Sequence, residues 1–305
     1  MKHLLPAIGI LLFSFLSSGC VYDDISECPA YADFYCRYLS ANKNTFYEEM
    51  RGDMCMHFYQ SSSHYRTEDV MAGSHDLRRP VHIQKSFAEG DLETVVWSCD
   101  DALDYDTVPG GKTLDESTVR LKENTAGSEL CRPATDLFYS RVAFTSVRKE
   151  DSRVDLDFTR PVCRIRVSLI PVTIQTREGG LPQQNDYTFR LYGTYGSLRY
   201  TDGATCGNSV VLSPDVKFDE KTGDIKTDWF CAFGSTSADT PEITNYLKVE
   251  VLRGSTVVAT FDCAPLELSS EPGRYIDLVI DGKYVRPKMT VYVNSWRVAI
   301  VDCDL

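Results

Sequence analysis

The chain has 305 residues, of which 43% are hydrophobic, and it carries a formal net charge of −12. Its 17 tyrosines and 14 phenylalanines, with the aliphatic residues, can build a sizeable core, which excludes a disordered stalk and suits two domains of ordinary size. The acidic balance argues against nucleic acid and against an anionic membrane surface as partners, because both need basic patches.

The first 19 residues have the layout of a secretory signal peptide. Lys2 and His3 form a short polar start, residues 4–16 are almost entirely apolar, and three small residues precede Cys20. This apolar stretch of about 13 residues is shorter than the roughly 20 that a transmembrane helix needs, so we expect residues 1–19 to be removed. No later segment of the sequence is long and apolar enough to span a membrane.

A cysteine directly at the cleavage site resembles the lipobox of bacterial lipoproteins, which carry diacylglycerol on that sulfur and an acyl chain on the new amino terminus. Ser17 stands where leucine is usual, and Leu16 lies one place earlier. We predict lipidation at Cys20. Several acyl chains, at about 0.8 kcal/mol per buried methylene, would make the attachment permanent. The alternative is a secreted protein with a free N-terminal cysteine.

The residues after Cys20 add a second targeting feature. Asp23 and Asp24 resemble the acidic export signal of Bacteroidales surface lipoproteins, which moves them to the outer leaflet. Acidic residues are also common in solvated linkers, and we expect residues 20–30 to form a lipidated linker. The prediction is a lipid-anchored protein of the outer membrane that faces the medium.

Residues 31–160 are predicted to form a first domain, with its boundary near residues 158–162. Apolar residues alternate with aspartates over Val154–Phe158, which indicates a β strand with one apolar and one wet face, whereas the rest of this half is less regular. Leu114, Thr118 and Leu121 instead share helical spacing, which predicts a short helix. The strands expected in this domain are Phe34–Leu39, Met54–Tyr59, Leu92–Trp97 and Val154–Phe158.

Residues 161–305 are predicted to form a second β domain made of successive hairpins. Arg253-Gly254-Ser255 has the length of a hairpin loop, and Asp281-Gly282 is a strong short hairpin signal. Short strands with turn signals at intervals of about ten residues are typical of β-sandwiches. The expected strands are Ile165–Leu169, Leu247–Val251, Val257–Phe261, Ile276–Ile280, Met289–Val293 and Val298–Val301.

The chain has 11 cysteines, and ten remain once Cys20 is assigned to lipid. In an exported protein such an even set permits several disulfides of unknown pairing, and we expect two or more. The alternative is that several are buried thiols. No two of the ten have the spacing of a zinc-binding pair, and neither His57 and His64 nor His75 and His82 have the four-residue spacing of helical ligands. We therefore expect no metal and no cofactor.

The sequence contains no recognisable catalytic constellation. There is no Gly-x-Ser-x-Gly motif for a serine nucleophile, and the paired glycines Gly110-Gly111 and Gly179-Gly180 are isolated turn residues. Among 44 acidic residues, carboxylate pairs are too common to indicate a glycosidase. The prediction is a protein that is not an enzyme.

Six short motifs spread over nearly the whole chain support a family resemblance. They are Cys20–Pro29, Leu92–Trp97, Thr113–Leu121, Asp136–Tyr139, Arg160–Ile165 and Val293–Trp296. In this order they resemble the Mfa-like and FimB-like lipoproteins, the anchor and accessory subunits of Bacteroidales fimbriae. The opening motif is the most specific of the six.

The resemblance implies two tandem transthyretin-like Greek-key β-sandwich domains and a role without catalysis. The lipid would hold the base of a fimbria on the outer membrane, while the folded body joins a fimbrial shaft subunit, a fimbrillin. In such fimbriae a strand of one subunit fills a groove in the next, which is donor-strand exchange. An anchor is expected to keep its own first strand, so that assembly stops there.

The first and the last strand are the predicted contacts with the polymer. The alternative is that both strands only complete their own domains. Trp97 and Trp296 are expected in the core. The predicted contact residues are Phe34, Tyr35, Leu39, Val298, Ile300 and Val301.

Two questions stay open at this level. The chain has more cysteines than the family leads us to expect, and a tip or accessory subunit fits the sequence as well as a base anchor does. A second hypothesis is a stand-alone surface adhesin or glycan-binding lipoprotein of the same fold, which would present an exposed aromatic platform among its many tyrosines.

Overall fold

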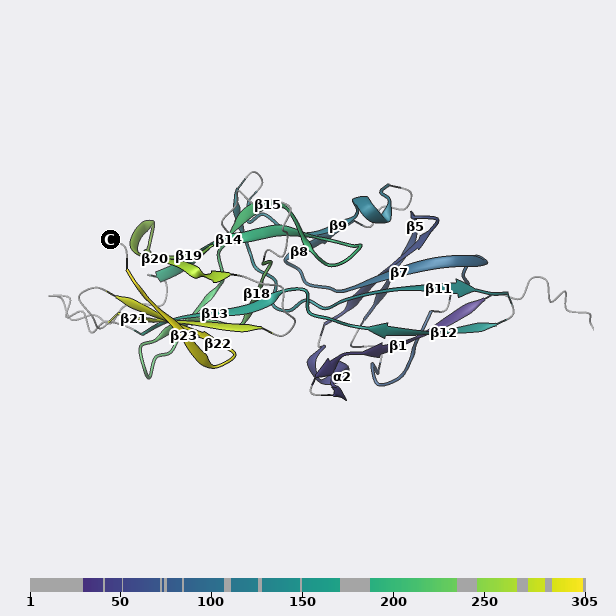
Figure 1. The fold of residues 1–305 in the computed structure, drawn as a ribbon, viewed down its shortest axis with the longest axis horizontal. Helices are drawn as coiled ribbons and strands as arrows, with labels where there is room; N and C mark the ends of the chain where they lie inside the picture. The colour runs from purple at the N-terminus through teal and green to yellow at the C-terminus, as the bar shows by residue number, and fades with distance from the viewer. Residues whose placement is uncertain are drawn as a thin grey trace, which may run out of the picture.

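The computed structural model shows an elongated molecule in which β sheets follow one another along the long axis (Figure 1). Regular structure is almost entirely β strand, which confirms the prediction of an all-β, sandwich-like fold. Two short helical segments are present in the described part, the α-helix α2 (Phe46–Glu49) and the 3-10 helix η2 (Leu114–Glu116). The structure describes residues 30–40, 42–50, 52–71, 73, 76–83, 85–106, 111–125, 128–148, 150–170, 187–234, 246–267, 274–282 and 287–303.

Two sheets form one half of the molecule. A four-stranded antiparallel sheet has the order β11-β7-β4-β5, and a three-stranded sheet has the order β12-β1-β6, with β1 and β12 parallel. The predicted strand at residues 34–39 ends earlier than expected, because Leu39 belongs to the separate small hairpin β2–β3. The strands are β1 (Tyr31–Arg37), β2 (Leu39–Ser40), β3 (Lys43–Asn44), β4 (Met54–Gln60), β5 (Ser63–Val70), β6 (Val81–His82), β7 (Gly90–Ser98), β11 (Tyr139–Ser146) and β12 (Asp151–Asp157).

Two seven-stranded sheets form the other half. The β13 sheet has the order β16-β17-β13-β21-β22-β23, with β18 also paired to β13. It contains β13 (Cys163–Ile170), β16 (Val216–Phe218), β17 (Ile225–Thr227), β18 (Phe230–Ala232), β21 (Tyr275–Asp281), β22 (Lys288–Val293) and β23 (Trp296–Asp302).

The β14 sheet has the order β10-β15-β14-β19-β20, with β9 paired to β14 and β8 paired to β9. Three of its strands come from residues 103–131, so this sheet takes strands from both sides of residue 160. The division of the chain at residue 160 stays a prediction. The strands are β8 (Leu103–Tyr105), β9 (Thr118–Leu121), β10 (Leu130–Cys131), β14 (Tyr187–Arg199), β15 (Thr205–Leu212), β19 (Tyr246–Arg253) and β20 (Thr256–Glu267).

The helix predicted from Leu114, Thr118 and Leu121 is wrong. Only η2 is helical, and the Glu116 carboxylate closes that turn by accepting hydrogen bonds from the backbone N–H and the hydroxyl of Thr113, at 3.0 and 2.9 Å. The chain then becomes extended and pairs with β14 and β8 as β9. Sheet pairing with strands far away in sequence therefore outweighed the local spacing.

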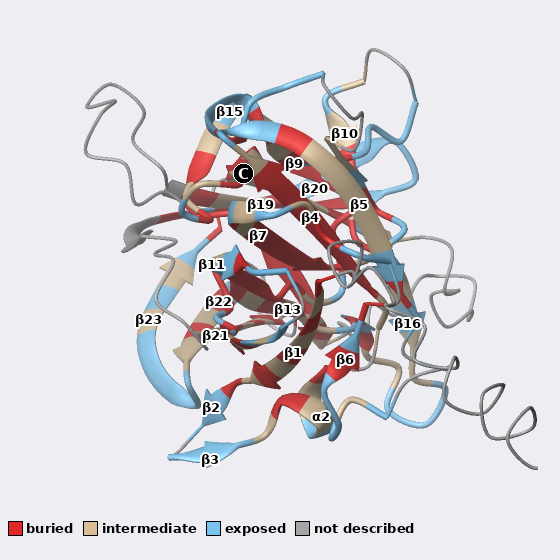
Figure 2. Ribbon diagram, turned by 90° about the vertical axis from the view of Figure 1, so that its right-hand side faces the viewer, coloured by how far each residue is buried: buried red, intermediate tan, exposed pale blue. Residues whose placement is uncertain are grey.

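The central strands of the four-stranded sheet, β4 and β7, are buried on both faces, and this ties the two halves together. Met56 and Phe58 pack with the three-stranded sheet in one hydrophobic cluster. Tyr59, Val95 and Trp97 pack into a second cluster, which also fills the space between the two seven-stranded sheets. Buried residues therefore run almost without interruption along β4 and β7, unlike the alternating pattern of a sheet with one wet face (Figure 2).

Candidate functional site: an open sheet edge and a buried junction

The last strand, β23, lies at the edge of the β13 sheet. It pairs with β22 on one side, and on its other side no strand of the described chain is paired to it. The two strands are joined by a two-residue turn in which Asn294 and Ser295 have positive φ angles of 48° and 70°, as type I′ hairpin turns require. The outer edge of β23 thus presents backbone N–H and C=O groups that another strand can bind.

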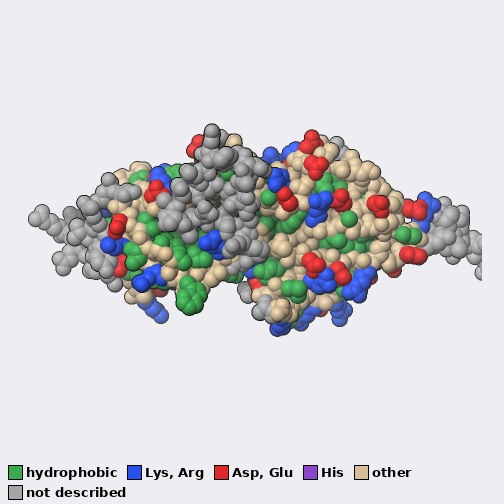
Figure 3. Space-filling model, viewed as in Figure 1, with side chains coloured by type: hydrophobic (Ala, Val, Ile, Leu, Met, Phe, Trp, Pro, Cys, Tyr) green, Lys and Arg blue, Asp and Glu red, His purple; other side chains and the backbone are tan. Residues whose placement is uncertain are grey.

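Several large apolar side chains of this edge strand are exposed to solvent. Trp296, Val298 and Ile300 are 79%, 54% and 57% exposed, whereas Ala299 and Val301 pack against the core. Figure 2 shows β23 as an exposed ribbon outside the buried strands. Figure 3 shows hydrophobic side chains at the surface of the half of the molecule that contains this strand. Natural edge strands are usually protected by charge, proline or a covering segment, so an exposed apolar edge indicates an interaction surface.

The placement of Trp296 in the core is wrong, while that of Trp97 is confirmed, since Trp97 is fully buried. Trp296 is the first residue of an edge strand directly after the turn, and it lies opposite Val293, which is itself only partly buried. The sequence pattern alone does not distinguish the rim of a sheet from its centre.

The first strand, β1, has a different environment. Phe34 is fully buried among aromatic rings, and β1 is paired to β12 along its whole length and to β6 over two residues. Tyr35 is half-buried beneath the Arg153 guanidinium, which lies 4.1 Å from the ring centre. Leu39 is 65% exposed on the small β2–β3 hairpin. The structure therefore does not bring the two predicted contact strands together.

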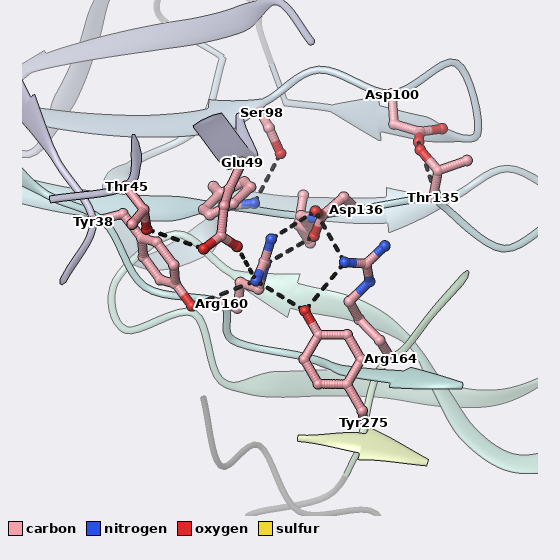
Figure 4. A network of polar contacts seen from close by, with 12 residues as sticks. Tyr38, Thr45, Glu49, Ser98, Asp100, Thr135, Asp136, Arg160, Arg164 and Tyr275 are labelled. Carbon is pink, nitrogen blue, oxygen red and sulfur yellow. Dashed lines mark hydrogen bonds and ion pairs between the residues drawn. The ribbon is translucent and has the colours of Figure 1, made fainter. Parts of the chain in front are cut away.

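A buried arginine joins segments from both halves of the molecule (Figure 4). Only 3% of the Arg160 side chain is exposed, and its guanidinium forms ion pairs with Glu49 at 2.8 Å and with Asp136 at 3.0 Å. It also donates hydrogen bonds to the hydroxyls of Tyr38 and Tyr275, at 3.5 and 3.4 Å. These partners come from the end of α2, the segment before β11, the residue that follows β1 and the start of β21.

The electrostatics of this junction favour the charged arginine. Burial opposes the charge on Arg160, but the attraction of Asp136 and the hydrogen bonds with it prevail and raise the pKa of the guanidinium. The ring of Phe138 adds a cation–π contact at 4.5 Å. Two of the family motifs, Asp136–Tyr139 and Arg160–Ile165, meet here, and this was the signal in the sequence that could have identified the junction.

A second buried polar cluster surrounds His57, on the face of β4 opposite to Met56 and Phe58. His57 is completely buried, with its Nδ1 atom 3.1 Å from the Thr67 hydroxyl and its Nε2 atom 3.2 Å from the Tyr200 hydroxyl. Burial, helped by nearby His64 and opposed by Asp106, lowers the pKa of His57 to about 3. The imidazole is therefore neutral at physiological pH and acts as a hydrogen-bonding link between β4 and the end of β14.

The cysteines form one disulfide in the described part of the chain, between Cys55 of β4 and Cys99 after β7. One of the two or more expected bridges is thus present there, and the expectation of a second stays a prediction. Other cysteines carry thiols in the core, where burial disfavours the thiolate. Buried thiols were the alternative given above. Those thiols are Cys36, Cys131, Cys163, Cys231 and Cys263.

The residues predicted for membrane attachment lie outside the described residues. This applies to the lipidation site Cys20 and to the export residues Asp23 and Asp24. Within the described chain, no helix has the length and apolar character to cross a membrane, and no group of three or more potential metal ligands occurs.

The family of the chain follows from its sequence. Residues 25–302 match the model of the fimbrillin-A associated anchor proteins Mfa1 and Mfa2. The chain belongs to this anchor family. Membership gives it a fimbria-associated role at the cell surface, and the family is one of structural anchor proteins rather than enzymes. No curated protein shows significant sequence similarity to it.

The fold of this chain is similar to those of solved structures from Porphyromonas and Bacteroides species. The fimbrial anchor protein Mfa2 of Porphyromonas gingivalis aligns with a TM-score of 0.57 and 12% identity, over 88% of this chain and 99% of that one. A Bacteroides ovatus protein described as an adhesin aligns with a TM-score of 0.58 and 13% identity, over 91% and 96%. A Bacteroides thetaiotaomicron protein described as polysaccharide-binding aligns with a TM-score of 0.58 and 14% identity, over 88% and 97%.

Proposed function

We propose that this protein is a lipoprotein that anchors or caps a fimbria and joins a shaft subunit by β-strand complementation. Lipid on Cys20 would hold the chain in the outer membrane, and Asp23 and Asp24 would direct it to the outer face. The two halves of the molecule would correspond to tandem transthyretin-like sandwich domains. A terminal position in the fibre, at the base or the tip, follows from this arrangement.

The observation that carries this proposal is the open edge of β23. A strand from a shaft subunit that paired with β23 would satisfy its outer backbone groups and bury part of the apolar surface of Trp296, Val298 and Ile300. Full burial of one such side chain contributes roughly 1.5–3 kcal/mol, so a continuous row supports a durable contact. Val301 belongs to the same strand but faces the core, so we expect it to support the edge from within.

The arrangement of β1 agrees with a subunit that keeps its own first strand. β1 is paired on both sides, and burial of Phe34 ties it to the core. Releasing it would expose that aromatic core and break the parallel ladder with β12. We therefore place the polymer contact at β23, and contact through Tyr35 and Leu39 would be confined to their exposed surfaces.

Lysine substitutions in β23 are expected to disrupt the joint without unfolding the protein. The double variant Val298→Lys/Ile300→Lys should reduce the fimbrillin recovered with the protein from outer membranes at least about tenfold, because two charges would have to be buried in the contact. Its own stability should change by no more than about 0.5 kcal/mol, since both side chains are exposed. Pull-down with mass spectrometry and urea unfolding are the two measurements.

A matched control is available on the other sheet. Val258 of the edge strand β20 is 41% exposed, and Val258→Lys should leave fimbrillin recovery unchanged. Undiminished recovery with the β23 double variant would reject the edge of β23 as the joint. Equal loss with Val258→Lys would move the joint to the β20 edge.

Removing the lipidation site tests the anchoring role separately. Cys20→Ala should release the protein from the outer membrane and shed fimbriae into the medium, as measured by fractionation and immunoblotting. The double variant Asp23→Asn/Asp24→Asn should stay membrane-bound and lose only its accessibility to added protease. Fimbriae that remain on Cys20→Ala cells would contradict the anchoring role.

A second candidate function, a surface adhesin or glycan-binding lipoprotein, is favoured by a hollow on the outer face of the β13 sheet that is lined by Trp229, Tyr275 and Tyr292. In that case the pull-down would recover the protein alone or with glycan-uptake components.

A further inference from the structure

A hollow of about 710 Å³ lies on the solvent-facing side of the β13 sheet. This volume falls within the range of roughly 300–1,000 Å³ that is typical of small-molecule sites. It is open to solvent and combines aromatic rings with a few polar groups. The residues on which the argument depends are Arg166, Trp229, Tyr275, Asp277, Tyr292 and Asn294.

Sheet register places the central side chains of the hollow in one row. Arg166 of β13 lies opposite Asp277 of β21, which lies opposite Tyr292 of β22. Their neighbours along each strand face the core and are buried, except Val293, which is partly buried. Because side chains alternate between the two faces of a strand, these three residues form a continuous strip on the outer face.

Internal contacts hold most of this strip in place. Arg166 makes a two-pronged pair with Asp277, with N–O distances of 3.2 and 2.5 Å, and its guanidinium lies 4.6 Å from the ring centre of Trp229. The rings of Trp229 and Tyr275 meet edge to face at 5.3 Å. The aromatic surface is therefore ordered before any ligand arrives, which lowers the entropic cost of binding.

Tyr275 connects the hollow to the buried junction. Its hydroxyl accepts hydrogen bonds from Arg160 and Arg164, at 3.4 and 3.3 Å. The position of the Tyr275 ring is thus fixed by the two arginines that bind its hydroxyl and by the Trp229 ring that packs against it. Tyr292 differs, because it makes no ring or cation–π contact within the described residues, so its half-buried ring can contact a ligand.

The charges of the hollow constrain the class of ligand. Arg166 and Asp277 neutralise each other, so an anionic ligand would have to compete with Asp277 for the arginine. A purely apolar ligand would leave the edge of this pair and the side-chain NH2 group of Asn294 without partners, since the Asn294 carbonyl oxygen already accepts from the backbone N–H of Tyr275 at 2.9 Å. A neutral carbohydrate meets both conditions, because sugar rings have apolar faces that pack on aromatic rings and hydroxyls that bond to paired polar groups.

We propose that this hollow is a binding site for neutral glycans. Trp229 and Tyr292 would pack against sugar rings, while Asp277 would accept hydrogen bonds from sugar hydroxyls and the side-chain NH2 group of Asn294 would donate one. The site is separate from the backbone edge of β23, so fimbrial joining and glycan binding can succeed or fail independently.

Calorimetric titration of the detergent-solubilised, lipidated protein tests this proposal. The probes are maltohexaose, cellohexaose, xylohexaose and mannohexaose, with the acidic hexamer of galacturonate as a charged comparison. At least one neutral hexamer should bind, and both Trp229→Ala and Tyr292→Ala should weaken it at least about tenfold, as truncation of a central aromatic contact does.

Trp296→Ala is the matched control, because Trp296 is an exposed tryptophan outside the hollow. It should bind the sugar as the unchanged protein does, whereas Trp229→Ala and Tyr292→Ala should recover as much fimbrillin in pull-downs as the unchanged protein. The proposal is overturned if no neutral hexamer binds at millimolar concentration, if only the galacturonate hexamer binds, or if Trp296→Ala weakens binding as much as Trp229→Ala.

Discussion

Replacing Arg160 with methionine is expected to lower the free energy of unfolding by about 3 kcal/mol, because it leaves two carboxylates facing each other without their shared cation. The penalty for breaking a buried ion pair is usually about 3–5 kcal/mol, and we take its lower end since Glu49 and Asp136 keep 27% and 25% of their side-chain surface exposed. Urea unfolding at neutral pH measures the change.

Two controls separate the network from general effects of removing arginine. Arg153→Met removes an exposed arginine that pairs with Asp155, and it should cost no more than about 1 kcal/mol. Arg160→Lys keeps the positive charge but cannot reach both carboxylates with a planar fork, so its stability should lie between those of Arg160→Met and Arg153→Met. A change below 1 kcal/mol for Arg160→Met would show that the junction does not stabilise the fold.

This junction also illustrates what the sequence could and could not predict. The Asp136–Tyr139 and Arg160–Ile165 motifs were visible as parts of a family resemblance. Their contact with Glu49 and Tyr275 depends on how the sheets pack, and no local spacing encodes it. The two motifs could therefore be identified from the sequence. Their structural role, which is to surround a buried charge with partners from four segments, became visible only in the structure.

Strands were predicted well where one face of a sheet is wet. Val167 and Leu278 alternate with polar residues, so their strands and core face follow directly from the sequence. Prediction failed where pairing between distant segments decides the outcome. Thr118 and Leu121 were assigned to a helix because the partner strand β14 is far away in the sequence, and Trp296 was assigned to the core because its position at the rim depends on strand order.

The candidate site was predicted in part for the same reason. Val298 and Ile300 were recognised as members of a last strand, and the structure adds that their strand is an edge with exposed apolar residues. The aromatic hollow gave no signal in the sequence, because Trp229 and Tyr292 are 63 residues apart and share a surface only through the register of β13, β21 and β22.

The buried histidine His57 predicts a specific acid sensitivity. Its pKa is 6.5 in an exposed chain and about 3 in the fold, chiefly because burial disfavours the imidazolium. Above pH 6.5 the ring is neutral in the folded and in the unfolded chain, so titration of His57 costs no stability and the free energy of unfolding has its full value. As the pH falls from 6.5 towards 3, the unfolded chain binds a proton that the folded protein excludes, at a cost of about 1.4 kcal/mol per pH unit.

His57→Gln removes this proton-linked loss and keeps a side chain that can bond to Thr67 and Tyr200. Urea unfolding across this pH range should therefore show the wild-type protein losing up to about 5 kcal/mol relative to the variant by pH 3, after normalisation at pH 7. Tyr200→Phe is the matched control, because it removes one hydrogen bond of His57 and leaves the titrating group in place. Tyr200→Phe should be less stable at every pH, but its free energy of unfolding should change with pH as steeply as that of the wild-type protein. Parallel plots of unfolding free energy against pH for wild type and His57→Gln would contradict the prediction, because they would mean that His57 accepts a proton in the folded state.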